Sequence, residues 1–175
     1  MRFAFAAALV AALTIVTQAQ TAIDAKLQEQ LKRLFPSAAS FSPRGGEPPH
    51  FKALAGAARG AQPTVIGYAF WTTDLQPLER GYDGPIKMLV GLDPKGLLTG
   101  VIVVEHHEPY GDFSIEQPRF PAQFLTKDIR DAFRVGSDID AVSRATITVT
   151  SATRAVRNSA RRIARTFLTP PGGTQ

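Results

Sequence analysis

The chain has 175 residues, 44% of them hydrophobic, a formal net charge of +5 and no cysteine. This length and composition fit one globular domain, and the lack of cysteine excludes disulfides, thiolate metal sites and iron–sulfur clusters from this chain. The charge is uneven, because residues 144–175 contain six arginines and no acidic residue, whereas the remaining 14 basic residues are balanced by 15 acidic ones. Such a basic segment attracts phosphates, acidic partners or anionic lipid, but it is also typical of the solvated face of an amphipathic helix.

Residues 1–19 have the pattern of a secretory signal peptide. Arg2 precedes an apolar stretch that runs to Val16, and small residues suited to cleavage follow it. We therefore expect a mature chain that begins near Gln20 and lies in the periplasm or another extracytoplasmic space. The apolar stretch is shorter than the roughly 20 residues of a spanning helix, so an uncleaved membrane anchor is the alternative. Export weighs against a nucleic-acid partner.

Residues 20–63 predict one helix followed by an irregular connection. Thr21–Asp24 resembles a capping box, and apolar residues at helical spacing follow it as far as Phe35. Pro36 ends the pattern. The rest of this segment is rich in Ala, Gly, Pro and Ser, which predicts no regular element apart from a short strand or turn near residues 51–57.

Residues 64–169 predict an antiparallel sheet with helices packed on it. Runs 64–72, 85–92 and 97–106 are rich in β-branched and aromatic residues, and Asp93–Gly96 suits a type I turn between the second and third runs. The centre of the sheet is apolar on both faces, so it needs cover from helices. The fold class expected is α+β, a twisted antiparallel sheet covered by helices.

Two later helices are predicted to supply that cover. One spans residues 121–133, and the other begins at Thr148 or Thr150 and ends at Phe167, with apolar residues at steps of three and four. Residues 170–175 contain two prolines and two glycines and are expected to be a disordered tail.

Just ahead of the final helix stands Asp140–Thr146, with the sequence DAVSRAT. A carboxylate and two hydroxyls here precede a helix N-terminus, where free N–H groups and the helix dipole favour an anion such as phosphate. The order Asp, two spacers, Ser, one spacer, Ala, Thr resembles the attachment motif of the covalent FMN-binding domain family. That family includes flavoprotein subunits of Rnf-type complexes and of the sodium-translocating NADH:quinone reductase, and the extracytoplasmic domain of the nitrous-oxide reductase regulator and maturation protein.

The resemblance implies that FMN is held at Thr146 through a phosphoester. It also implies that Asp140 orients the hydroxyl or engages the metal of the modifying enzyme. Ser143 and Thr148 are expected to hydrogen-bond phosphate oxygens, with capping of the final helix as an alternative and compatible role. Ala145 completes the motif.

Arg144 departs from the family pattern, which commonly has Gly between the Ser and the Ala. An arginine tolerates positive φ only at a cost, so we expect an ordinary backbone conformation here. Its guanidinium is then expected to pair with the phosphate. The alternative is that Arg144 blocks the modifying enzyme and leaves Thr146 without flavin.

Two further segments are similar to family segments near the flavin. Gly81–Ile86 (GYDGPI) precedes the second strand. In this segment Gly84, Pro85 and Ile86 are expected to contact the flavin. Without the resemblance, the same six residues are also typical of a simple turn. His106–Pro109 (HHEP) resembles the family's His, spacer, Glu, Thr, Pro segment and is closest to the branch associated with nitrous-oxide reductase, although the Thr is absent and YGDF replaces the glycine-rich continuation.

His106 and Glu108 are therefore expected either to fix this loop by hydrogen bonds or to contact the flavin. A metal site is not expected, because adjacent strand residues point to opposite faces and too few ligands remain.

These observations predict an exported FMN-binding electron-transfer domain that needs separate membrane or periplasmic redox proteins as partners. A flavin transferase would attach the cofactor, FMN, and we expect no autonomous catalysis. Peripheral contact with a membrane surface is a further expectation. The alternative is a flavin-free exported module that docks an acidic partner through its Arg-rich C-terminal helix.

Overall fold

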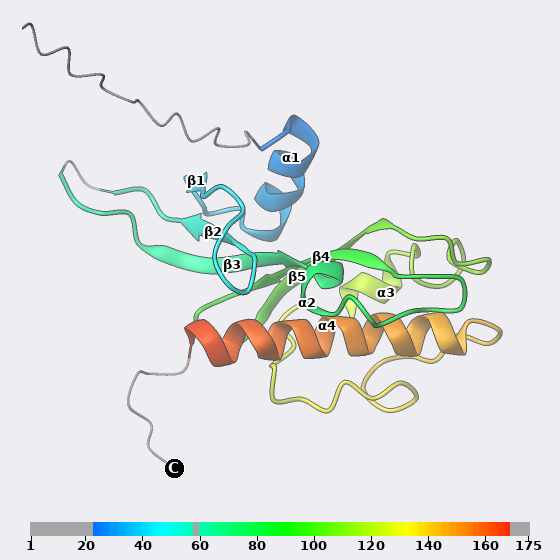
Figure 1. Ribbon diagram of the computed structural model, residues 1–175. Coiled ribbons are helices and arrows are strands. Elements are labelled where there is room, and N and C mark those ends of the chain that lie inside the picture. The colour runs from blue at the N-terminus through cyan, green and yellow to red at the C-terminus, as the bar shows by residue number, and fades with distance from the viewer. Residues whose placement is uncertain (1–22, 58–59, 169–175) are drawn as a thin grey trace, which may run out of the picture.

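The computed structural model describes residues 23–57 and 60–168 and shows a five-stranded antiparallel sheet with helices on both faces (Figure 1). The strands lie side by side in chain order, which is the simplest antiparallel topology. They are β1 (Ser40–Phe41), β2 (Phe51–Leu54), β3 (Val65–Trp71), β4 (Lys87–Leu92) and β5 (Leu98–Glu105). The helices are α1 (Ala25–Leu34), α2 (Thr72–Leu75), α3 (Arg119–Ala122) and α4 (Thr146–Phe167). The predicted α+β fold class is confirmed.

The helix α4 covers one face of the sheet, and α1 covers the other (Figure 1). The larger core joins Met88 and Val90 of β4 to the apolar face of α4, including Val156 and Ile163, all of them fully buried. The smaller core packs Leu31, Leu34 and Phe35 from the end of α1 against strand residues such as Leu89. Side chains alternate between the two cores along the strands, as a two-sided sheet requires.

The predicted hairpin between β4 and β5 is confirmed. The N–H of Gly96 donates to the carbonyl of Asp93 at 3.1 Å, and the Asp93 carboxylate accepts from the N–H groups of Lys95 and Leu97, each at 2.8 Å. Asp at the first turn position therefore fixes both the turn and the register, in the way Asx turns do.

The first helix begins three residues later than a cap at Thr21 would place it. Asp24 is the N-cap, and its carboxylate accepts from the N–H of Leu27 at 2.7 Å. Asp is at least as good an N-cap as Thr, which accounts for the difference. Thr21 itself lies outside the described residues.

The helix predicted over residues 121–133 is wrong in length. Only α3, a single turn, forms, and Thr126 and Phe133 both have positive φ, at 62° and 51°. The reason is tertiary, because the chain leaves the helix to pair with the start of β5: Thr126 N–H donates to the Leu98 carbonyl, and Leu98 N–H donates to the Lys127 carbonyl. The apolar residues Phe124 and Phe133 still reach the core.

The predicted signal peptide (1–19) and tail (170–175) lie outside the described residues. None of the helices within residues 23–57 and 60–168 has the length and apolar content needed to cross a membrane.

Candidate functional site

The site centres on the buried carboxylate of Glu108, which joins three segments that are distant in sequence. Its two oxygens accept hydrogen bonds from the N–H groups of Tyr82 at 2.8 Å and Asp83 at 3.0 Å, and from the hydroxyl of Thr148. The side chain is thereby held between the turn before β4, the loop after β5 and the first turn of α4. Of the predicted site residues, Glu108 and Thr148 are brought into direct contact.

Glycines make this arrangement possible. Gly81 N–H donates to the Gly84 carbonyl at 2.7 Å, which closes the turn that presents the Tyr82 and Asp83 amides. A side-chain carbon on Gly81 would collide with the Glu108 carboxylate, so this close approach requires glycine. Pro85 is exposed, whereas Ile86 is buried in the larger core and so serves packing.

The loop after β5 is fixed by His106. Its Nδ1 accepts from the Glu108 N–H at 3.1 Å, and its Nε2 lies 2.7 Å from Oε1 of Glu116. Because Nδ1 accepts, the ring proton of the neutral form stands on Nε2 and is donated to Glu116. Both ring nitrogens are thus occupied, which supports the loop-fixing role predicted for His106.

The pKa of Glu108 lies below its usual value. Burial raises this pKa, but the hydrogen bonds from Thr148, Tyr82 and Asp83 outweigh burial, and His106 adds a favourable charge interaction. Glu108 is therefore an anion at neutral pH, held by donors rather than by a salt bridge. A buried anion of this kind is an anchor and not a proton donor.

Thr146 is the first residue of α4 and its side chain is exposed. The sequence predicts a start at Thr148 or Thr150, so the helix begins two residues before the first of these. No side chain caps it, so the capping role considered for Ser143 and Thr148 is wrong. The first intrahelical bond runs from Val149 N–H to the Ala145 carbonyl at 2.9 Å, which leaves the N–H groups of residues 146–148 without an intrahelical partner.

Arg144 has a φ of 68°, so the expectation of an ordinary backbone conformation there is wrong. The chain needs a left-handed residue at this position to turn from Ser143 into the helix, while Ala145 is buried against the core. This geometry explains why glycine suits the position, and an L residue held there costs roughly 1 kcal/mol. The Arg144 side chain remains exposed.

A hollow of about 370 Å³ lies beside the attachment motif. Asp140 and Ser143 line it together with Phe113 and Gln123. Asp140 pairs with Arg119, at 2.6 Å between the closest nitrogen and Oδ2, and its N–H donates to the Gln123 side chain at 2.6 Å. Arg119 and Gln123 thus orient Asp140. The sequence alone does not predict these contacts, because both partners are distant from Asp140 in the chain.

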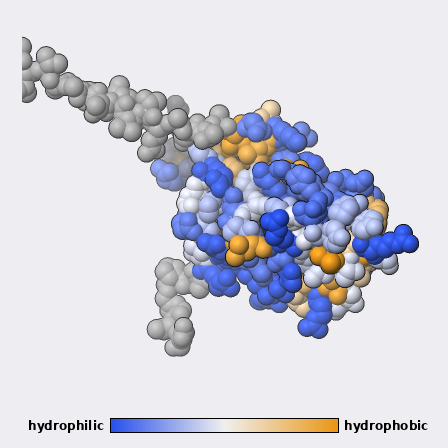
Figure 2. Space-filling model, turned by 45° about the vertical axis from the view of Figure 1, so that its right-hand side comes forward, coloured by the Kyte–Doolittle hydropathy of each residue, from blue (hydrophilic) through white to orange (hydrophobic). Residues whose placement is uncertain are grey.

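Exposed apolar side chains concentrate on the three segments that Glu108 joins. Among the six large hydrophobic residues that the described structure leaves exposed, four belong to these segments: Tyr82, Tyr110, Phe113 and Ile147. The rings of Tyr110 and Phe113 lie 5.3 Å apart. Figure 2, in which the end of the molecule carrying the N-terminus of α4 comes forward, shows a largely hydrophilic surface with separate hydrophobic spots. An end of the molecule with exposed aromatic residues and a free helix N-terminus suits a ligand with a flat ring and a phosphate.

The arginines of α4 are largely engaged within the molecule. Arg154 pairs with Glu79 at 2.7 Å and Arg162 with Glu47 at 3.0 Å, while Arg161 donates to the carbonyls of Ile129 and Asp131, each at 2.8 Å. These contacts leave less of the basic face available for an acidic partner than the sequence suggested.

Within the described part of the chain, no three His, Asp or Glu residues are grouped as a metal site would require.

Comparison with known proteins agrees with this geometry. The family model of the FMN-binding domain matches residues 81–161, which begin at the turn contacting Glu108 and end within α4. This match places residues 81–161, a little under half of the chain, in the FMN-binding domain family.

Two kinds of curated relative are similar to it. The G component of the ion-translocating oxidoreductase complex of Yersinia pestis is 34% identical over 126 residues, covering 66% of this chain and 56% of that protein. The Regulatory protein NosR of Pseudomonas aeruginosa is 32% identical over 110 residues, covering 57% of this chain and 15% of that protein. The corresponding G component from Haemophilus influenzae is 53% identical over 47 residues, or 27% of this chain and 21% of that protein. The chain thus spans about half or less of the length of these relatives.

Proposed function

We propose that this protein is an extracytoplasmic electron-transfer domain that carries FMN in a phosphoester bond to Thr146. The observation that carries the proposal is the exposed hydroxyl of Thr146 on the first residue of an uncapped helix, inside a family whose members bind FMN. A phosphate joined to this oxygen lies next to the free N–H groups, where the helix dipole stabilises its charge.

Residues around Thr146 would hold the attachment point, the phosphate and the flavin ring. Glu108 fixes the first turn of α4 through Thr148, so the attachment point keeps a constant geometry relative to the two neighbouring loops. The hydroxyl of Ser143 and the guanidinium of Arg144, both exposed, are available to the phosphate oxygens. The exposed rings of Tyr110 and Phe113 offer apolar contact to the isoalloxazine, whose alternating redox states supply the electron transfer.

Attachment requires a flavin transferase with FAD as donor. The Thr146 oxygen forms a bond to the phosphorus of the FMN moiety, the pyrophosphate bond of FAD breaks, AMP leaves, and the hydroxyl proton passes to solvent. Asp140, oriented by Arg119, is the residue proposed to engage the transferase or its metal. A permanent bond suits a protein exported by a signal peptide at residues 1–19, since lost FMN would be diluted outside the cell.

The electron partners are proposed to be separate membrane or periplasmic redox proteins, by analogy with the oxidoreductase complexes named for the relatives. Flavin fluorescence on a denaturing gel tests the proposal, with the protein exported from a host that also makes a flavin transferase. The wild-type band should fluoresce and the Thr146→Ala band should not. A wild-type band without fluorescence would refute the covalent attachment.

A further inference from the structure

A hollow of about 560 Å³ lies at the C-terminal end of α4, between this helix, the turn from β4 to β5 and the loop after α3. We call it the basic hollow. Apolar residues such as Ile129 and Leu168 line part of it. Its lining also holds four basic residues and, within the described ranges, no acidic one: Lys95, Arg130, Arg161 and Arg165. At about 1.5 Å per residue, Arg161 lies roughly 23 Å along α4 from Thr146, so the basic hollow is far from the proposed flavin (Figure 1).

A chain of hydrogen bonds holds the three walls of the basic hollow together. The N–H of Ile129 donates to the carbonyl of Gly96 in the turn at 3.0 Å. The guanidinium of Arg161 donates from Nε to the carbonyl of Ile129 and from Nη2 to the carbonyl of Asp131, each at 2.8 Å. The walls are therefore fixed before any ligand arrives, which reduces the entropy lost on binding.

Three of the four charges in the basic hollow are not neutralised by a carboxylate. Arg161 is half-buried and held by carbonyls, which position the guanidinium but leave its charge intact. The side chains of Lys95 and Arg165 are exposed and make no ion pair or hydrogen bond with any residue in the described ranges. The negative end of the helix dipole offsets only part of the charge on Arg165. Arg130 is different, because both carboxylate oxygens of Asp128 bind it.

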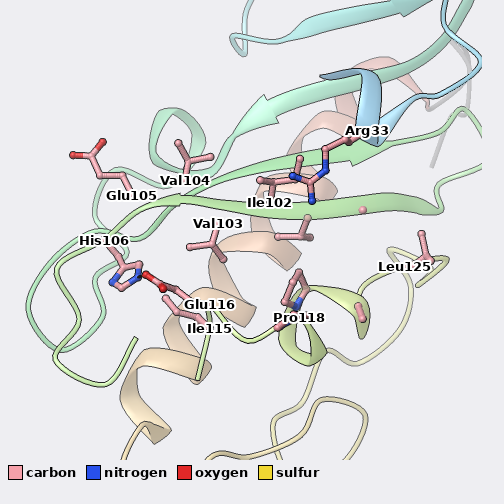
Figure 3. Close-up of a pocket in the computed structure, with 14 residues that line it drawn as sticks. Arg33, Ile102, Val103, Val104, Glu105, His106, Ile115, Glu116, Pro118 and Leu125 are labelled. Atoms are coloured by element: carbon pink, nitrogen blue, oxygen red, sulfur yellow. Dashed lines mark hydrogen bonds and ion pairs between the residues drawn. The ribbon is translucent and has the colours of Figure 1, made fainter. Parts of the chain in front are cut away.

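Other hollows in the described part of the chain lack this excess of charge. The hollow of about 800 Å³ beside β5 has both signs, since Figure 3 shows Arg33 on one side and Glu105 and Glu116 toward one end. A hollow of about 290 Å³ is lined by arginines, but Arg154 among them pairs with Glu79. Of these three hollows, the basic hollow is thus the one whose charge favours an anion.

We propose that the basic hollow binds a phosphate group carried on a small organic molecule or a lipid headgroup. Three cations from separate segments suit a tetrahedral group with several oxygens, whereas a carboxylate is planar and presents two. The apolar part of the lining suits the remainder of the molecule. The volume also falls within the range of small-molecule sites, about 300–1,000 Å³, and a docked protein typically needs a larger surface, about 800 Å² on each partner.

Amide chemical shifts in the isotope-labelled protein, recorded during titration with glycerol 3-phosphate at constant ionic strength, test this site. The amides of Gly96, Ile129 and Leu168 should shift together with a single dissociation constant, while the amide of Thr146 should not move. The inference stands without the flavin, so the Thr146→Ala variant should bind equally. Unchanged shifts around the basic hollow would count against it.

Matched variants localise the binding. Lys95→Gln and Arg165→Gln should each weaken binding about three- to tenfold, because each removes one charge-assisted contact with the phosphate. Lys26→Gln and Arg33→Gln remove the same charges elsewhere and should bind as the wild type does. Neither Lys95→Gln nor Arg165→Gln should lower the free energy of unfolding in urea, because both side chains are exposed and unpaired within the described structure.

Cosedimentation with phosphatidylcholine vesicles, with and without phosphatidic acid, identifies the source of the phosphate. Binding that requires phosphatidic acid and is weakened by Arg165→Gln assigns a lipid headgroup, and binding of glycerol 3-phosphate alone assigns a free organic phosphate. Either result supports the proposal. It is overturned if neither probe binds, or if Arg33→Gln weakens binding as much as Arg165→Gln does. It is also overturned if a glutamate-rich peptide displaces glycerol 3-phosphate at lower concentration, because the occupant would then be an acidic protein segment.

Discussion

Replacing Glu108 tests the physical basis of the site. Alanine at this position removes the acceptor for three donors: the amides of Tyr82 and Asp83 and the hydroxyl of Thr148. Each buried donor left without a partner costs about 1–3 kcal/mol, but Tyr82 and Asp83 are exposed and regain water. Only the Thr148 hydroxyl then stays buried without a partner, so we expect the free energy of unfolding to fall by about 1–3 kcal/mol, which corresponds to about 2–12 °C in Tm for a chain of this size.

Urea denaturation followed by circular dichroism measures this change. Glu108→Gln keeps the shape but places an amide NH₂ against a donor, so a loss of about 1–2 kcal/mol is expected. Glu116→Gln is the matched control, because Glu116 is 52% exposed and makes one ion pair, worth at most about 1 kcal/mol. If Glu108→Ala lost less than Glu116→Gln, the carboxylate would not be the anchor of the three segments.

Three further predictions concern the same region. Gly81→Ala should lower the free energy of unfolding by about 1–3 kcal/mol, because its new methyl group displaces the Glu108 carboxylate, and in the Glu108→Ala background the loss should largely disappear. Arg144→Gly should stabilise the protein by up to about 1 kcal/mol and Arg144→Val should destabilise it, because the backbone is left-handed there; equal stability of the two variants in thermal denaturation would argue against this conformation. The pKa of Glu108 is lowered in the folded state by its hydrogen bonds, so its stabilisation is complete above the unfolded value of about 4 and is lost as the pH falls below it. Urea titrations from pH 6 to 3 should therefore show a shallower loss for Glu108→Gln than for wild type.

Local sequence patterns predicted much of the fold. The three central strands were recognisable from their β-branched and aromatic runs, and the turn at Asp93 from its Asx and glycine chemistry. The long amphipathic pattern of α4 is clear in the sequence, although the predicted start, at Thr148 or Thr150, lies later than the observed start at Thr146. These features depend on residues close together in the chain.

Features that depend on distant residues escaped prediction. The apolar spacing over 121–133 indicated a helix, but pairing of residues 126–128 with β5 replaced it after one turn. The contact between Glu108 and Thr148 joins positions 40 apart, and no local pattern encodes it. The left-handed conformation of Arg144 was likewise hidden, since arginine gives no signal for positive φ.

The docking of an acidic partner through α4 is less favoured than the sequence alone suggested. Arg154, Arg161 and Arg162 bind groups within the molecule, so part of the positive charge stabilises the fold. Their long side chains also cover the helix surface. The excess of arginine in this segment is therefore explained in part by packing of α4 against the rest of the chain.

The most direct test of the account is tandem mass spectrometry of the protein exported together with a flavin transferase. We predict one adduct with the mass of FMN less one water, located on the peptide that contains Thr146. The adduct should persist in Thr146→Ser, which keeps an alcohol, and vanish in Thr146→Ala. An adduct on Ser143 or Thr148, or one that persists in Thr146→Ala, would contradict the account.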